Sequence, residues 1–127
     1  MKYGVIVAED EILIQQNIIK KIENSGAGFT VVGNAQTGIQ ALDLINSCNP
    51  YLLVTDIRMP VMDGLEATRT IRAMEREDAK TIPIFAVTAN AFSDDIAASR
   101  ASGMNEHLSK PLKFEELNAM ICKYVKR

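Results

Sequence analysis

The chain has 127 residues, and 14 Lys and Arg against 16 Asp and Glu give it a net charge of −2. This length suits one domain with a sizeable core, so we expect residues 1–127 to form a single domain. The charge argues against direct contact with nucleic acid, because modules that bind it carry a basic excess. No apolar run reaches the roughly 18 residues that span a bilayer, and no signal-peptide pattern precedes the first strand-like run. We therefore expect a cytoplasmic protein without membrane contact, in which Cys48 and Cys122 are reduced packing residues.

Strand-like and helical hydrophobic periods alternate along the whole chain. In chain order we expect a strand at 4–8, a helix at 12–24, a strand at 29–33, a helix capped by Thr37 and ending before Asn49, a strand at 51–55, a helix from about Gly64, a strand at 84–87, a helix at 93–102, a strand at 106–109 and a helix at 114–126. Gly26 and Gly103 are the expected C-caps of the first and fourth helices. The alternation predicts an α/β fold, a doubly wound five-stranded parallel sheet with five helices on its two faces. The flavodoxin-like strand order 2-1-3-4-5 places strands one, three, four and five side by side.

Four of the five strand-like runs end on polar side chains. Glu9 and Asp10 follow the first run, Asp56 follows the third, Thr88 the fourth and Lys110 the fifth. The carboxyl ends of parallel strands meet at one edge of a sheet, where ligands of open α/β folds bind. We therefore expect these side chains to share one cleft.

Three carboxylates in one cleft repel each other and raise each other's pKa unless a cation is present. Mg²⁺ suits such a site, because it prefers oxygen ligands and usually takes one or two carboxylates together with phosphate oxygens. A carboxylate beside Mg²⁺ can attack a phosphoryl group and form an acyl phosphate. The Lys110 ammonium and the Thr88 hydroxyl suit the phosphoryl oxygens, where charge spreads during transfer.

Each residue also has an ordinary structural interpretation. Glu9 and Asp10 resemble a helix N-cap pair, Thr88 an N-cap or turn residue, and Lys110 a solvated charge. Asp56 fits this alternative least well, because the loop containing Pro60 and Gly64 separates it from the next helix. The joint occurrence of polar residues on four strand ends favours the functional interpretation.

Four segments resemble the receiver domain of two-component response regulators. They are Glu9-Asp10, the stretch Thr-Asp-Ile-Arg-Met-Pro-Val-Met-Asp-Gly at 55–64, Val87-Thr88-Ala89, and Ser109-Lys110-Pro111. The resemblance covers essentially the whole chain, and the central stretch is highly specific. It implies a phosphoacceptor signalling domain, with at most self-phosphorylation and self-dephosphorylation activity.

The resemblance also implies a role for each matching residue. Asp56 would accept a phosphoryl group from a phosphohistidine on a sensor histidine kinase or phosphotransfer protein. Asp10 and Asp56 would bind Mg²⁺, with the backbone carbonyl of Arg58 or its predecessor completing the shell and Glu9 acting through water. Thr88 would be the switch hydroxyl and Lys110 the counter-charge of the phosphoryl group. The family also has a cis peptide bond at the position that follows Lys110.

One position departs from the commonest pattern of this family. His107 stands where Tyr or Phe is usual, three residues before the lysine, and its ring is the expected switch ring. Its ordinary interpretation is a partly exposed residue of the fifth strand, which we favour over a metal or catalytic role. An imidazole can carry charge near neutral pH, so its inward packing could depend on pH. Arg58 and Asn90 flank the phosphoacceptor and the threonine, where side chains tune the lifetime of the acyl phosphate.

Output is expected from the surface of the fourth helix, fifth strand and last helix, residues 93–127. This surface would meet a partner or form a homodimer, with Phe92, Met104 and the exposed side of the last helix as candidate contacts. The alternative function is a haloacid-dehalogenase-like phosphatase or phosphotransferase that uses Asp56 as a turnover nucleophile. Such enzymes carry a second Asp two residues later, where this chain has Arg58. A nucleotide- or flavin-binding module is a third possibility, but no Gly-rich phosphate loop follows any strand.

Overall fold

The computed structural model describes residues 3–24, 28–88, 93–110 and 113–125. Its elements in chain order are β1 (Tyr3–Ala8), α1 (Ile12–Glu23), β2 (Phe29–Ala35), α2 (Gly38–Cys48), β3 (Leu52–Asp56), α3 (Gly64–Arg72), β4 (Ile84–Thr88), α4 (Ser93–Ser102), β5 (Glu106–Ser109) and α5 (Phe114–Val125). The strands form one parallel sheet in the order β2-β1-β3-β4-β5. The predicted fold class and strand order are both confirmed.

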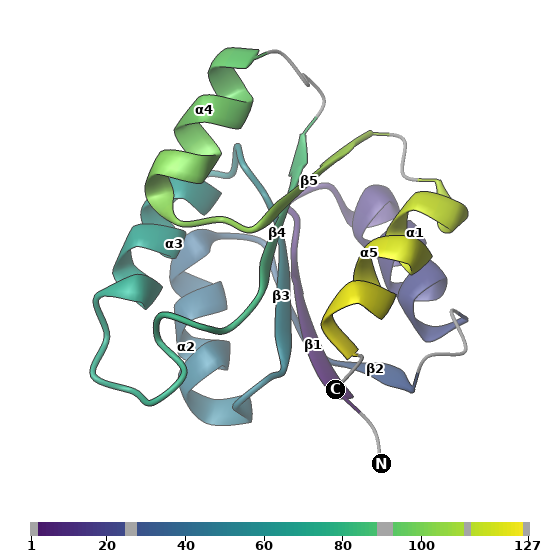
Figure 1. Cartoon of the computed structure of the whole chain (residues 1–127), viewed down its shortest axis with the longest axis horizontal. Helices are drawn as coiled ribbons and strands as arrows, with labels where there is room; N and C mark the ends of the chain where they lie inside the picture. Colours follow the sequence, from purple (N-terminus) through teal and green to yellow (C-terminus); the bar gives the residue numbers. More distant parts are fainter. Residues whose placement is uncertain (1–2, 25–27, 89–92, 111–112, 126–127) are drawn as a thin grey trace.

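The sheet is covered on both faces. Helices α1 and α5 lie on one side, and α2, α3 and α4 lie on the other (Figure 1). Each face has its own apolar cluster, one around Ile18, Phe85 and Ile121 and one around Ile45 and Ile71. All residues of β3 and β4 are buried. This double burial explains why both central strands read as continuous apolar runs.

The predicted element boundaries agree with the structure to within a few residues. Strand β2 continues to Ala35, two residues further than expected, because Ala35 pairs with Ala8 at the end of β1. Strand β3 lies one residue further along the chain than expected, and β4 is one residue longer, so that Asp56 and Thr88 are the last residues of their strands. Thr37 caps α2 as expected.

Helix ends also follow local chemistry. The Asp63 side chain accepts a hydrogen bond from the Glu66 amide at 2.9 Å and so caps α3. Gly103 closes α4 as expected, with φ of 109°, a conformation that a Cβ atom disfavours. Helix α1 ends at Glu23 with Asn24 as its C-cap, and the expected cap, Gly26, lies outside the described residues.

Two expectations about side-chain burial are wrong. Met104 is buried in the cluster beneath α2 and α3, because the turn after α4 directs it inward, so it is not a surface contact. Cys122 is exposed on α5 and does not pack in the core. Phe92, Asn90 and the bond between Lys110 and Pro111 involve residues outside the described part of the chain.

Among the described helices, none combines the length and the apolar character needed to cross a membrane.

Candidate functional site

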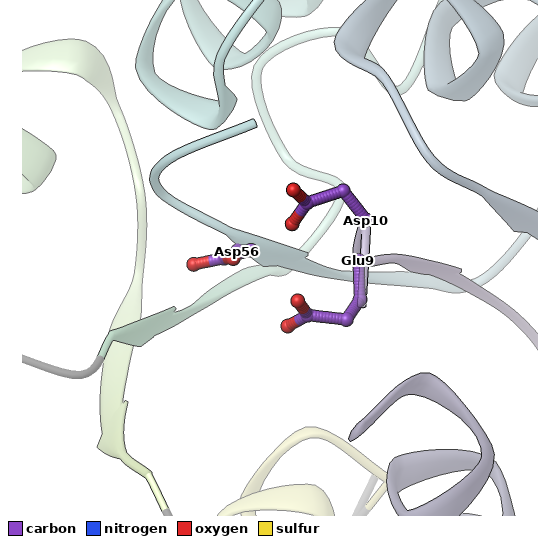
Figure 2. A group of neighbouring side chains, drawn as sticks. All are labelled: Glu9, Asp10 and Asp56. Atoms are coloured by element: carbon purple, nitrogen blue, oxygen red, sulfur yellow. The ribbon is translucent and has the colours of Figure 1, made fainter. Parts of the chain in front are cut away.

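The carboxyl edge of the sheet carries a cluster of three carboxylates. Glu9 and Asp10 follow β1, and Asp56 ends β3, the neighbouring strand. Each offers an oxygen that lies within 4.8 Å of those of the other two. Figure 2 shows the three carboxylates side by side beyond the ends of these strands. Glu9 and Asp56 are buried, whereas Asp10 is exposed.

Lys110 joins this cluster from the other side. Its Nζ lies 3.0 Å from Glu9 Oε1 and 3.1 Å from Asp56 Oδ2. The Lys110 side chain is 14% exposed, which rules out the interpretation as a solvated surface charge. Its backbone amide donates to the Thr88 carbonyl at 2.9 Å, which seats the end of β5 beside the end of β4.

Burial and charge shift the proton equilibria of the cluster. Burial is the main cause that raises the pKa of Glu9 from 4.5 to about 7, and the Asp56 charge adds to it. The bond to Lys110 opposes this rise but does not cancel it. Burial also disfavours the charged form of Lys110, yet its contacts with Glu9 and Asp56 outweigh burial and raise its pKa. Lys110 therefore stays charged, while Glu9 accepts a proton near neutral pH.

Gln15 positions the end of β1, and the sequence analysis did not identify it. Its Nε2 donates to the Glu9 carbonyl at 3.1 Å and to the Ala35 carbonyl at 3.0 Å. The Ala35 carbonyl also accepts from the Glu9 amide at 2.9 Å. The buried Gln15 amide thus fixes the peptide that carries the two acids. The sequence did contain an indication of this role, because Gln15 lies at helical spacing from Ile18 and Ile22 and so falls on the buried face of α1.

The loop after Asp56 folds back tightly over the sheet edge. The Gly64 amide donates to the Ile57 carbonyl at 2.9 Å, and a Cβ atom at Gly64 would clash with the Asp56 carbonyl. The Arg58 amide lies 3.4 Å from Asp56 Oδ1, at the long end of hydrogen bonding. The Met62 carbonyl accepts from the Gly38 amide at 2.7 Å, which ties the loop to the start of α2. The Arg58 side chain is exposed.

Thr88 and His107 occupy the strands beside Asp56. Thr88 is buried at the end of β4, one register position past Val87, the β4 partner of Asp56. The His107 Nε2 contacts the hydroxyl of Ser99, a fully buried residue of α4, so the ring is directed toward that helix. Burial and the nearby Arg100 charge lower the pKa of His107. The neutral ring is thus the favoured form at neutral pH.

The donor set of this cluster fits a hard divalent cation. Three carboxylates from adjacent strands converge, and two of them are buried beside only one ammonium group in the described part of the site. Oxygen ligands of this kind are the ones that Mg²⁺ prefers. The structure brings together Glu9, Asp10, Asp56 and Lys110, with Thr88 on the adjacent strand end.

The chain matches the family model described as the response regulator receiver domain over residues 5–122. It is 38% identical over 130 residues to hybrid signal transduction histidine kinase I of Dictyostelium discoideum, covering 95% of this chain and 7% of that protein. It is 35% identical to the chemotaxis protein CheY of Pseudomonas aeruginosa, covering 96% of each chain.

A solved structure has the same fold. The receiver domain of the sensor histidine kinase PA1611 from Pseudomonas aeruginosa is 32% identical, with a TM-score of 0.85 and 98% of both chains covered, and its magnesium ion is coordinated in the active site cleft. These matches support the receiver prediction and not the haloacid-dehalogenase alternative. Receiver domains are phosphoacceptor signalling domains of two-component systems, and they typically bind Mg²⁺ at an acidic pocket. The chain belongs to the response regulator receiver domain family.

Proposed function

We propose that residues 1–127 act as a single receiver domain in which Asp56 accepts a phosphoryl group from a phosphohistidine. The donor is a sensor histidine kinase or a phosphotransfer protein in the cytoplasm. The observation that carries this assignment is the Asp56 carboxylate, held at the end of β3 and 3.1 Å from the Lys110 ammonium, within a cluster of three acids. The chain spans only 7% of the length of its Dictyostelium relative, so the proposal concerns the receiver domain and not the activity of that whole kinase.

The site residues divide the chemistry between them. A carboxylate oxygen of Asp56 attacks phosphorus, the new P–O bond forms as the P–N bond of the phosphohistidine breaks, and the imidazole leaves with the bonding electron pair. Lys110 pairs with one phosphoryl oxygen and the Thr88 hydroxyl donates to another. Because the transition state is loose, positioning and charge neutralisation supply most of the rate.

Asp10 and Asp56 would hold Mg²⁺ directly, the Arg58 carbonyl would complete the protein ligands, and Glu9 would act through water. When bound, the ion would supply positive charge for the phosphoryl oxygens. Arg58 stands where a phosphatase of the alternative class carries its acid, so hydrolysis lacks a proton donor at that position. This supports a site that retains its phosphoryl group.

Phosphorylation would be passed on to a partner through the elements beside Thr88. His107 lies on β5 and contacts Ser99 of α4, so a shift of Thr88 toward a phosphoryl group would open space next to the ring. The surface of α4, β5 and α5 would then change and meet a partner or a second copy of the chain. The net charge of −2 supports output without direct contact between this domain and nucleic acid.

Acetyl phosphate with Mg²⁺ tests the assignment of Asp56. We expect intact mass measurement to show one added phosphoryl group on the wild type and none on Asp56→Asn. Asp43→Asn, which removes an exposed carboxylate from α2, is the matched control and should label like the wild type. Equal labelling of Asp56→Asn would show that the phosphoacceptor lies elsewhere.

A further inference from the structure

Helix α4 buries small polar side chains where a helix that covers a sheet usually buries large apolar ones. Its buried side chains, among those that the structure describes, are the serines Ser99 and Ser102. Ile96 is only half-buried. Because little apolar area leaves water, the attachment of α4 to the domain depends on its polar contacts.

Two side-chain contacts tie the described part of α4 to neighbouring elements. At the C-terminal end of the helix, Arg72 donates to the Gly103 carbonyl through Nη2 at 2.8 Å and through Nε at 3.1 Å. One turn earlier, the Ser99 hydroxyl contacts Nε2 of His107 on β5. The first contact fixes the end of the helix. The second is therefore the contact whose loss frees the body of α4.

Strand β5 directs successive side chains to the helices on its two sides. Glu106 bonds to α5, where its Oε2 accepts from the Tyr124 hydroxyl at 2.7 Å and lies 3.1 Å from Lys123 Nζ. His107, the next residue, contacts α4. The two helices lie on opposite faces of the sheet (Figure 1). Because the Glu106 carboxylate is engaged with α5, it offsets a positive charge on the imidazole only in part.

The Ser99 hydroxyl determines where the protons of this contact lie. Its Oγ donates its single proton to the Ile96 carbonyl at 2.9 Å. The oxygen is then an acceptor for the Nε2–H group of His107, so the neutral ring carries its proton on Nε2. Protonation of the other ring nitrogen places a positive charge against α4.

The surroundings of the ring disfavour its charged form. Burial is the main cause that lowers the pKa of His107, and the charge of Arg100 on α4 adds to it. Glu106 on β5 and the Ile96 carbonyl oppose this change without cancelling it. On β4 the strand partner of His107 is Ala86, which carries no charge. A proton therefore binds more readily once the ring has left this site for solvent.

We propose that the contact between His107 and Ser99 is a proton-sensitive latch on α4, which acid and phosphorylation of Asp56 both release. This inference rests on the function proposed for Asp56. The ring lies on the strand next to that of Thr88, so a shift of Thr88 toward a phosphoryl group reaches it directly. Because a proton and a phosphoryl group release the same helix, each favours binding of the other. Phosphorylation therefore raises the pKa of His107, and acid shifts α4 toward its phosphorylated arrangement.

NMR titration of the ring tests the latch. His107 is the only histidine of the chain, so its ring proton gives a single curve. The curve is recorded from pH 5 to pH 8 in Mg²⁺, with and without beryllofluoride, a stable analogue of the phosphoryl group. We expect beryllofluoride to raise the pKa of His107 toward its ordinary value of 6.5 in the wild type.

Ser99→Ala is the variant that removes the latch. Its His107 should titrate near 6.5 without beryllofluoride, and the analogue should change this value little. The comparison separates release of the ring from the direct effect of the negative charge of the analogue, which both proteins experience.

Amide hydrogen exchange measures the release of α4 itself. From pH 7.5 to pH 5.5, after correction for the intrinsic exchange rate, protection of α4 amides should fall by about fivefold in the wild type. It should stay constant in His107→Phe, which keeps an aromatic ring but cannot titrate. Glu9 also titrates in this range, but His107→Phe retains it, so the difference between the two proteins belongs to His107. The amides of α2 are the internal control and should keep their protection.

Three results would overturn the latch. They are a pKa of His107 that beryllofluoride leaves unchanged, a pKa in Ser99→Ala at or below that of the wild type, and an equal loss of α4 protection in His107→Phe. A wild type that acetyl phosphate fails to label on Asp56 would instead overturn the phosphoacceptor assignment. The acid release of α4 would then still be measurable by exchange.

Discussion

Replacing Glu9 by Gln should stabilise the metal-free protein at high pH. Glu9 is fully buried, and its pKa rises from 4.5 to about 7 on folding. Each pH unit of such a rise corresponds to about 1.4 kcal/mol, so the charged form costs about 3 kcal/mol of folding free energy. Because the site opens toward solvent at Asp10, we expect a measured value of about 2–3 kcal/mol.

The sign of this effect follows from proton binding. Below pH 4.5 the carboxyl group is protonated in the folded and the unfolded states, and the free energy of unfolding carries no penalty. Between pH 4.5 and about 7 the folded state binds more protons, so stability falls as pH rises. Above about pH 7 the penalty is constant. Glu9→Gln removes it, so its advantage should grow from about pH 5 to about pH 7 and then level off.

Urea unfolding in EDTA, repeated from pH 5 to pH 8.5, measures this difference. Glu11→Gln is the matched control, because it removes the same charge from an exposed position two residues away. It should show no comparable pH-dependent gain. A Glu9→Gln advantage that is flat across the range, or greatest at pH 5, would refute the reasoning. Added Mg²⁺ should reduce the advantage, because a bound cation stabilises the carboxylate.

Three further variants test other parts of the structure. Gln15→Met keeps the side-chain length but removes both hydrogen bonds that fix the acid-bearing peptide, so calorimetry should show Mg²⁺ affinity lower by about tenfold. Arg72 donates to three carbonyls, those of Ala79 and Ile82 between α3 and β4 and that of Gly103 after α4. Arg72→Met should therefore lower the free energy of unfolding by about 2–4 kcal/mol, with the exposed Arg69→Met near zero. His107 should titrate below 6.5 by NMR. The unfolded state then binds more protons, so stability falls as pH drops below 6.5, and His107→Gln should reduce this fall in urea unfolding.

The sequence predicted the strand order and the convergence of acids because both depend on simple periodic rules. Buried parallel strands are continuous apolar runs, and the first polar residue after each run marks its carboxyl end. This logic found Asp56, Glu9 and Lys110 without any knowledge of distances. The structure adds that Lys110 is shared between two carboxylates, which spacing along the chain does not specify.

The features that sequence reasoning missed depend on tertiary contacts. Gln15 looks like an ordinary polar residue of a helix until its two carbonyl partners, one of them 20 residues away, are known. Met104 was predicted to be a contact of the output surface because it lies between the fourth helix and the fifth strand, but the turn after α4 buries it. Val61 adopts a left-handed backbone with φ of 67°, which the sequence did not indicate, because a β-branched residue is among the least expected there.

The burial of Glu9 makes this site depend on a cation. Two buried acids and one exposed acid face a single ammonium group among the described residues of the cluster, so a fully ionised site carries excess negative charge before any phosphoryl group arrives. In the absence of metal, the raised pKa of Glu9 allows a proton to reduce that excess near neutral pH. A divalent cation reduces the excess negative charge in place of that proton and leaves Glu9 ionised. The carboxyl group that weakens the metal-free fold thereby strengthens attraction for the ion that phosphoryl transfer requires.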